Sequence, residues 1–261
     1  MTLHVERHGP PDAPTVLLLH GGGTAGWSWQ DQLPALRRAG YRVLVPDLPG
    51  HGQSPGPFHM EDAAAQVARL LREEGGSARV VGFSLGAQLG LQLLADHPEL
   101  FVSALLTGTL AAPMPGGGVM LSGPLRTLLA WYWPQRTARL PLWLNRLTLE
   151  LPARLGPQLA EDARRMSLDG HLQMTRANLT FRPPGQLAHL QVPVLVLAGA
   201  RELPIIRRSA RQLERLLPHG QARLVPGMLH TWPLSHPQRF NRILLTWLQR
   251  GRVASGLRPV N

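Results

Sequence analysis

The stretch from residue 80 to residue 86 constrains the fold of this chain more than any other. Its sequence is Val-Val-Gly-Phe-Ser-Leu-Gly, and a helix-prone run rich in leucine and alanine follows it directly. β-Branched residues before the Gly-x-Ser-x-Gly pattern and a helix after it predict a strand, a sharp turn and a helix. Such a turn needs small residues two before and two after the serine, and Gly82 and Gly86 meet that need. Ser84 is therefore a candidate nucleophile beside the positive end of a helix, the alternative being an ordinary strand-to-helix turn.

A glycine-rich loop precedes this stretch. Residues 15–19, Thr-Val-Leu-Leu-Leu, are a continuous apolar run typical of a strand buried on both faces, and His20, Gly21, Gly22 and Gly23 follow it. Glycines let a loop bring backbone N–H groups close to a ligand, and lipases and esterases use this histidine–glycine pattern for one oxyanion-hole donor. Gly22 is our candidate donor, with Gly23 as the alternative. We interpret His20 as a hydrogen-bonded core histidine rather than a catalytic base.

Strands and helices alternate along most of the chain. Short apolar runs predict strands, and helical spacing of apolar residues predicts helices. The strands are expected at residues 3–6, 15–19, 41–45, 78–83, 102–107, 192–199 and 222–225. The helices are expected at residues 61–73, 85–95, 207–217 and 240–248. This alternation predicts an α/β fold with a doubly wound, mostly parallel sheet.

The alternation stops between residues 111 and 188. This segment has prolines, glycines and helical pieces but no convincing strand, so we expect a helical lid inserted into a core made of residues 1–110 and 189–250. Residues 251–261 are expected to be a frayed tail. The apolar residues of the lid, including Trp131, Trp133 and Trp143, either line a pocket or pack on the core, and both interpretations stay open.

Five arginines of the insertion are a further candidate group. One of them could pair with a substrate carboxylate, but a solvated charged face is the simpler interpretation. They are Arg126, Arg136, Arg139, Arg146 and Arg154.

Two candidate partners for Ser84 follow later predicted strands. Glu202 comes shortly after one strand, and His230 lies on a loop after the next. Because the carboxyl ends of parallel strands meet at one edge of a sheet, these three residues are expected to converge. Asp47 and His51 lie in a segment dense in proline and glycine, so we interpret them as loop-forming residues rather than catalytic ones.

Composition excludes several functions. There is no cysteine, so disulfides, thiolate metal sites and cysteine nucleophiles are ruled out. The net charge of +11 is carried by arginines scattered through every segment, which favours a solvated basic surface over a specific nucleic-acid site. No apolar run reaches the roughly 18 residues of a membrane span, and the first residues lack the apolar segment of a signal peptide. We expect a cytoplasmic protein without a membrane span or a specific nucleic-acid partner.

With these residues in place, the chain resembles the α/β-hydrolase superfamily along nearly its whole length. The resemblance rests on four segments in the right order: residues 20–23, residues 47–54 (Asp-Leu-Pro-Gly-His-Gly-Gln-Ser), residues 82–86, and His230. The order serine, acid, histidine is also that of the family.

The resemblance implies a role for each candidate. Ser84 would attack a carbonyl, His230 would take its proton and pass it to the leaving group, and Glu202 would orient His230. The backbone N–H groups of Gly22 and Leu85 would form the oxyanion hole. No metal or organic cofactor is required.

Two positions depart from the family's usual pattern. Glu202 stands where aspartate is more common, which adds a methylene group, and Met228 and Leu229 precede His230 where glycine and another small residue are frequent. A serine at position 84 argues against haloalkane dehalogenase and epoxide hydrolase chemistry, because both need a carboxylate nucleophile.

The function implied is that of a serine hydrolase. Its small-molecule substrate would be a carboxylic ester or related acyl compound with an apolar part, cleaved through an acyl-enzyme. Hydrolysis of a carbon–carbon bond, a thioester or a lactone, or cofactor-free perhydrolysis, would use the same residues. A ligand-binding relative that turns over poorly is a further alternative. The sequence leaves the oligomeric state open.

Overall fold

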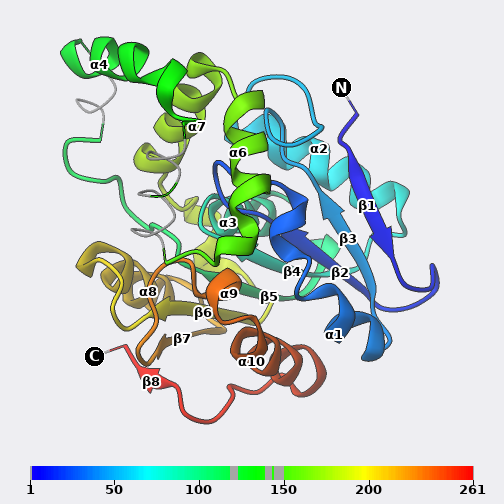
Figure 1. Ribbon diagram of the computed structural model, residues 1–261. Helices are drawn as coiled ribbons and strands as arrows, with labels where there is room; N and C mark the ends of the chain where they lie inside the picture. Colours follow the sequence, from blue (N-terminus) through cyan, green and yellow to red (C-terminus); the bar gives the residue numbers. More distant parts are fainter. Residues whose placement is uncertain (1, 118–122, 139–142, 144–149, 261) are drawn as a thin grey trace.

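The computed structural model describes residues 2–117, 123–138, 143 and 150–260. Arg139 and Arg146, two of the five arginines of the insertion, lie outside the described residues. Within the described part, an eight-stranded sheet runs through the molecule in the order β1-β3-β2-β4-β5-β6-β7-β8 (Figure 1).

The sheet is mostly parallel, as the alternation of strands and helices predicts. Its strands are β1 (Val5–His8), β2 (Thr15–Leu19), β3 (Arg42–Pro46), β4 (Ala78–Phe83), β5 (Phe101–Thr107), β6 (Val194–Gly199), β7 (Gly220–Val225) and β8 (Arg258–Pro259). From β3 to β7 every neighbouring pair in the sheet is parallel, whereas the edge strands β1 and β8 pair antiparallel.

The last residues differ from the expectation of a frayed tail. β8 pairs with Arg223 and Leu224 of β7, and Val260 beyond it is only 9% exposed. The edge of β7 offers unpaired backbone groups, so a short segment without any strand pattern of its own is held there by the ladder.

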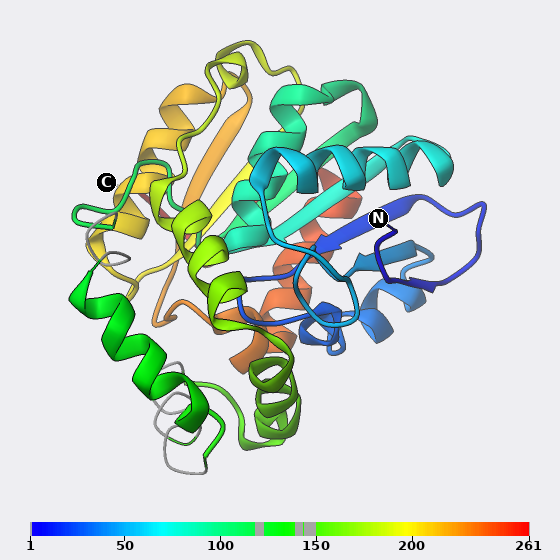
Figure 2. The ribbon, with the colours of Figure 1, turned by 90° about the horizontal axis from the view of Figure 1, so that it is seen from above.

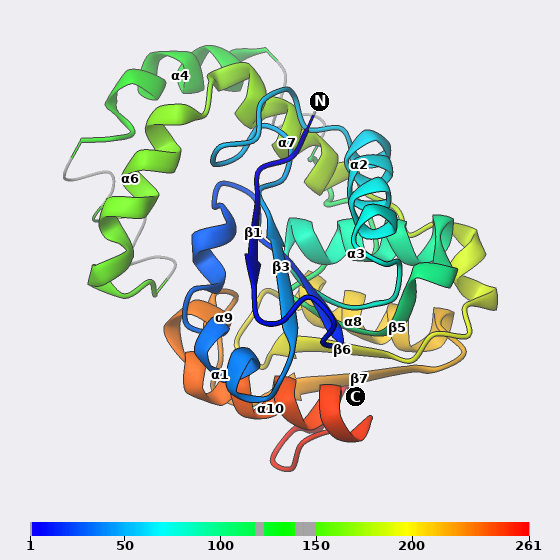
Figure 3. The ribbon, with the colours of Figure 1, turned by 90° about the vertical axis from the view of Figure 1, so that its right-hand side faces the viewer.

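Helices cover both faces of the sheet. One face packs against α2 (Met60–Glu73), α3 (Leu85–Asp96) and α8 (Pro204–Leu216), and the other packs against α1 (Leu33–Arg38), α9 (Trp232–Ser235) and α10 (Pro237–Arg250) (Figure 3). The pleat of β2 divides accordingly: Leu17 and Leu19 face the first layer, and Val16 and Leu18 face the second. All of β2 is therefore buried, which explains its uninterrupted apolar sequence.

Among its described residues, the segment between β5 and β6 contains helices and turns but no strand. It contains α4 (Pro124–Tyr132), α6 (Gly156–Arg165) and α7 (Leu168–Thr180). Short 3-10 turns follow α4 at η4 (Trp133–Gln135), precede α6 at η5 (Ala153–Leu155) and lie between α7 and β6 at η6 (Gly185–His189). Seen from above, α7 lies between α4 and the sheet (Figure 2). None of the helices in the described residues is long and apolar enough to cross a bilayer.

The described arginines of this segment have different environments. Arg126 forms an exposed ion pair with Asp169, as a solvated face would. Arg136 is instead partly buried: its guanidinium donates to the carbonyls of Ala163 at 2.9 Å and Met166 at 3.1 Å and lies over the ring of Trp133. The interpretation as a solvated face is therefore wrong for Arg136, which links the η4 turn to the junction of α6 and α7.

Candidate active site

The turn between β4 and α3 holds Ser84 in an unusual backbone conformation. Its φ of 54° and ψ of −116° are rare for a residue with a side chain, and its N–H donates to the carbonyl of Thr107 on the neighbouring strand at 2.9 Å. Ser84 is partly exposed, whereas Phe83 and Leu85 on either side of it are buried. The turn therefore leaves the Ser84 side chain accessible while its two neighbours are buried.

The two glycines around Ser84 are required by close packing. A Cβ atom at Gly82 would lie 2.6 Å from the carbonyl oxygen of Gly86, and one at Gly86 would lie 2.2 Å from that of Leu19. Both neighbours are backbone atoms, which cannot move aside without shifting the strand or the helix. The expectation that only small residues fit at these positions agrees with this geometry.

Ser84, His230 and Glu202 come together at the carboxyl edge of the sheet. His230 Nε2 lies 3.1 Å from Ser84 Oγ, and His230 Nδ1 lies 3.2 Å from Glu202 Oε2. The Glu202 side chain is 1% exposed, whereas that of His230 is 36% exposed. In the tautomer with a proton on Nδ1, His230 donates to the carboxylate and can accept the serine proton at Nε2.

The acid loop and the histidine loop are joined through their backbones. Glu202 Oε1 accepts a hydrogen bond from the N–H of Gly199 at 3.0 Å, and the N–H of Arg201 donates to the carbonyl of Met228 at 2.9 Å. The Met228 side chain is buried in the core beneath the loop rather than beside the serine. The two departures from the usual family pattern are therefore accommodated with His230 in contact with both of its partners.

The glycine loop after β2 lies beside Ser84. An added Cβ at Gly21 would lie 3.5 Å from Ser84 Cβ, and one at Gly22 would lie 3.6 Å from Leu85 Cδ2. In the described part of the chain, the N–H groups of Gly22 and Leu85 donate to no hydrogen bond. Gly23 has a φ of 73°, and a Cβ there would have nothing within 4 Å. Of the two candidate donors, Gly22 is thus the one packed against the residue that follows the serine.

His20 is held inside the core by hydrogen bonds. Its Nδ1 lies 2.9 Å from the carbonyl of Gly21, and its Nε2 accepts from the N–H of Leu48 at 2.9 Å. Burial lowers the pKa of His20 to about 4, so the ring is neutral. The interpretation of His20 as structural is confirmed.

Asp47 and His51 form the loop after β3. The carboxylate of Asp47 accepts from the N–H groups of Gly26 at 2.7 Å and Gln53 at 2.8 Å. His51 Nδ1 lies 3.0 Å from the carbonyl of Pro49, and burial lowers the pKa of His51 to about 3. Neither residue contacts Ser84, which agrees with their interpretation as loop-forming residues.

Two residues near the site, Gly108 and Met174, were not singled out by the sequence. Gly108, directly after β5, leaves room for the histidine ring, since a Cβ there would lie 2.8 Å from His230 Cε1. Met174 of α7 lies over the glycine loop, because its sulfur would be 2.6 Å from a Cβ at Gly22. A glycine immediately after a strand was the only available clue to Gly108, and Met174 had none.

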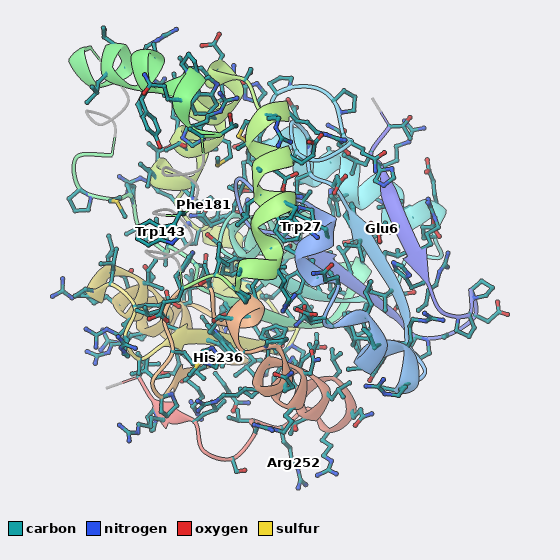
Figure 4. All side chains as sticks on the ribbon, in the orientation of Figure 1. Glu6, Trp27, Trp143, Phe181, His236 and Arg252 are labelled. Carbon is teal, nitrogen blue, oxygen red and sulfur yellow. The ribbon has the colours of Figure 1, made fainter. Side chains whose placement is uncertain are left out.

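Two polar contacts join the insertion to residues 27–31, which follow the glycine loop. The indole N–H of Trp27, in the 3-10 turn η1 (Gly26–Trp29), donates to Asp162 Oδ2 of α6 at 2.6 Å (Figure 4 labels Trp27). The carboxylate is mostly buried, and burial raises the pKa of Asp162 to about 6. Arg154 adds an ion pair with Asp31 at 2.6 Å just beyond η1.

A cavity of about 740 Å³ lies along α7 but not at Ser84. Its walls come from the start of α2 and from α4 and α7, with buried Phe58 and Phe181 and exposed Arg126, Arg176 and Arg182 among them (Figure 4 labels Phe181). None of Ser84, Glu202 and His230 lines it. Among the described residues, no three histidine, aspartate or glutamate side chains gather as a metal site would require.

Comparison with known proteins shows the family to which the chain belongs. The model of the alpha/beta hydrolase family matches residues 16–243. The chain is 31% identical, over 94% of both chains, to RutD of Serratia proteamaculans (strain 568), provisionally named a carbamate hydrolase. It is 28% identical to the pimeloyl-[acyl-carrier protein] methyl ester esterase of Aeromonas hydrophila subsp. hydrophila, over 94% of this chain and 98% of that one. In fold it is similar to the bromoperoxidase from Bacillus anthracis, with a TM-score of 0.77, 22% identity and 95% of each chain covered. The chain therefore belongs to the α/β-hydrolase family.

Proposed function

We propose that this α/β hydrolase is a serine hydrolase that cleaves a carboxylic ester or a related acyl compound through an acyl-enzyme. The observation that carries the proposal is the continuous chain of contacts from Ser84 Oγ to His230 Nε2 at 3.1 Å and from His230 Nδ1 to Glu202 Oε2 at 3.2 Å. A serine hydroxyl has little nucleophilicity unless a base takes its proton, and this arrangement supplies the base and a buried acid that orients it.

Each residue has a defined task in the proposed reaction. As the Ser84 oxygen bonds to the acyl carbon, His230 takes the hydroxyl proton and then delivers it to the leaving group. The charge that develops on the carbonyl oxygen is met by the N–H groups of Gly22 and Leu85, which donate to nothing else in the described part of the chain. Water, activated by His230, then hydrolyses the acyl-enzyme and restores the serine.

We propose further that residues 111–188 act as a lid that covers Ser84 and shapes an apolar pocket. Met174 of this segment packs against Gly22 of the glycine loop, and its side chain is buried and apolar. Gln88 of α3 also donates to the carbonyl of Asn178 at 3.0 Å, so α7 is fastened directly above the helix that begins at the serine turn. A pocket roofed by α7 would favour an apolar group next to the scissile bond.

The bond that is cleaved is the open part of the proposal. One relative is named for a carbamate and another for a methyl ester. In both kinds of substrate, the serine attacks a carbonyl carbon that carries an oxygen or nitrogen leaving group. The rest of the acyl group stays on the serine. A panel of p-nitrophenyl esters and p-nitrophenyl carbamates of matched chain length compares the two, because the leaving group is the same in every member.

The deciding experiment is intact-mass analysis after incubation with a fluorophosphonate probe. We expect a single adduct on the wild-type protein and none on Ser84→Ala, while Ser77→Ala, which changes an exposed serine far from the turn, labels like the wild type. Glu202→Gln should label more slowly, because the histidine loses the charge that stabilises its protonated form.

Turnover of p-nitrophenyl esters tests the same residues independently. Ser84→Ala is expected to lower kcat by about six orders of magnitude, to the background of the oxyanion hole. His230→Ala should have an effect of similar size, since the two residues act as a unit. Labelling or turnover that survives in Ser84→Ala would reject the proposal.

A further inference from the structure

A small hollow beside α8 gathers three arginines and no acid. Arg207, Arg208 and Arg211 lie within the first two turns of α8, and all three line a hollow of about 250 Å³. The rest of its lining is apolar: Pro204 at the start of the helix, Leu224 of β7 and Val260 after β8. Figure 1 shows α8, β7 and β8 together near the C-terminal end of the chain.

The positive charges of this hollow have no partner in the described part of the protein. Ten of the other described arginines pair with a carboxylate, such as Arg223 with Glu214 at 3.2 Å. The side chains of Arg207 and Arg208 form no ion pair or hydrogen bond with any described residue, and the side chain of Arg211 donates only to the carbonyl of Val260 at 3.3 Å. The guanidinium charges therefore repel one another without compensation.

Arg207 points most clearly to a missing partner. Its Nε atom is buried from solvent and has no hydrogen-bond acceptor. A buried donor without an acceptor costs about 1–3 kcal/mol, and a water, an ion or a ligand at the hollow would remove that cost. An anion in the hollow would supply the acceptor.

The position of the arginines on the helix adds a second electrostatic cost. The N-terminal end of a helix carries a partial positive charge, so basic residues are disfavoured in its first turn. α8 nevertheless begins Pro-Ile-Ile-Arg-Arg and has no acid in its first turn. Sequence choices that oppose local stability in this way are expected where a residue serves binding.

We propose that this hollow is a binding site for an organic phosphate monoester. Three guanidinium groups can donate to a tetrahedral dianion from several directions, whereas a planar carboxylate carries one charge and accepts mainly in its own plane. The apolar lining from Pro204, Leu224 and Val260 fits a small hydrocarbon or aromatic group attached to the phosphate. A volume of about 250 Å³ equals roughly eight water molecules, enough for a phosphate and a small substituent.

The site is separate from the proposed hydrolase reaction and does not depend on it. Binding should be the same in Ser84→Ala as in the wild type, so the failure of one proposal leaves the other standing. The affinity for phenyl phosphate, inorganic phosphate and benzenesulfonate is measured by calorimetry at constant ionic strength, with any purification tag at the N-terminus because Val260 lines the hollow. We expect saturable binding with phenyl phosphate the tightest and the monoanion benzenesulfonate the weakest.

Three variants locate the binding. Arg207→Gln and Arg208→Gln should each weaken phenyl phosphate binding about tenfold or more, because each removes a charge-assisted hydrogen bond. Arg215→Gln is the matched control: it removes the same charge from the same helix, but Arg215 is exposed and does not line the hollow. It should bind like the wild type. Arg208 is exposed, so its variant tests the site even where Arg207→Gln does not fold.

Several results would overturn the proposal. These are the absence of saturable binding, an equal loss of affinity in Arg215→Gln, and unchanged affinity in both hollow variants. A second readout is the Tm without ligand, which should stay level or rise in Arg208→Gln because a repulsive charge is gone. A fall of several degrees would identify Arg208 as a structural residue instead.

Discussion

Replacing Asp162 by asparagine is expected to make the protein more stable at pH 7.5. The Asp162 carboxylate is buried between α6 and the η1 turn, and it accepts a hydrogen bond from the indole N–H of Trp27 at 2.6 Å. Burial raises the pKa of Asp162 to about 6, more than the hydrogen bond from Trp27 lowers it. Asparagine keeps an oxygen that can accept from Trp27 but carries no charge to bury.

The size and pH range of the effect follow from the shifted pKa. Between the ordinary value of 3.8 and the folded value of about 6, the folded protein binds a proton that the unfolded chain has lost. The free energy of unfolding therefore falls as the pH rises through this range and stays low above it. A difference of about two units corresponds to about 3 kcal/mol, which is the upper limit of the gain expected for Asp162→Asn at pH 7.5.

Urea unfolding of the wild type and Asp162→Asn, from pH 4.5 to pH 8, measures this effect. Other groups titrate in the same range, so the difference between the two proteins is the quantity that reports Asp162. That difference should be small near pH 4.5 and grow until about pH 7. Trp27→Phe is the companion variant: it leaves the carboxylate without its donor and should lower stability at pH 7.5 by about 1–3 kcal/mol. A variant Asp162→Asn less stable than the wild type at pH 7.5, or a difference that does not change with pH, would refute the reasoning.

Two further predictions concern the core. Gly86→Ala should lose about 1–3 kcal/mol of stability and most probe labelling, because its Cβ would meet the carbonyl oxygen of Leu19 at 2.2 Å. The control is Gly90→Ala in the same helix, where the nearest neighbour is the movable side chain of Leu106. Thermal unfolding should show the stability of Gly90→Ala to be close to that of the wild type. Acid should lower the free energy of unfolding below about pH 6.5, because burial lowers the pKa of His20 to about 4 and of His51 to about 3. Below that pH these histidines bind protons in the unfolded chain but stay neutral in the folded protein. For His20 alone, the loss in the free energy of unfolding is on the order of 3 kcal/mol by pH 4. The prediction is contradicted if the free energy of unfolding of Asp162→Asn stays constant from pH 7 to pH 4.5.

The sequence was sufficient to predict the mostly parallel sheet and the meeting of Ser84, Glu202 and His230 in space. Both follow from one property of parallel strands, since the end of each strand reaches the same edge whatever lies between them. The catalytic roles and the boundaries of the lid at residues 111 and 188 remain predictions.

Other features depend on contacts between residues far apart in the chain. Trp27 and Asp162 are separated by 135 positions, and neither position has a pattern that names the other. The pairing of β8 with β7 depends on an open sheet edge rather than on the short segment itself. Arg136 looks like any surface arginine until the carbonyls of Ala163 and Met166 are placed around it. Sequence periodicity reports which face of an element is apolar, but it carries no information about such single polar contacts.

Glu202 allows a last prediction, because the longer acid is built into the geometry of its loop. The chain turns back so that Glu202 Oε1 accepts from the N–H of Gly199, and Gly199 has no room for a Cβ because the carbonyl oxygen of Met228 would be 2.3 Å from it. We therefore expect the acid loop to keep its position rather than move toward His230 when the side chain is shortened. Glu202→Asp keeps the charge but should lose one of its two contacts and lower kcat/KM about 10²-fold, as a small misplacement of a catalytic group does. Glu202→Gln keeps the length of the side chain and loses the charge. Comparing the two variants therefore separates the effect of side-chain length from the effect of charge. Wild-type turnover and probe labelling in Glu202→Asp would mean that the loop adapts, and that the backbone contact between Arg201 and Met228 does not fix the position of the acid.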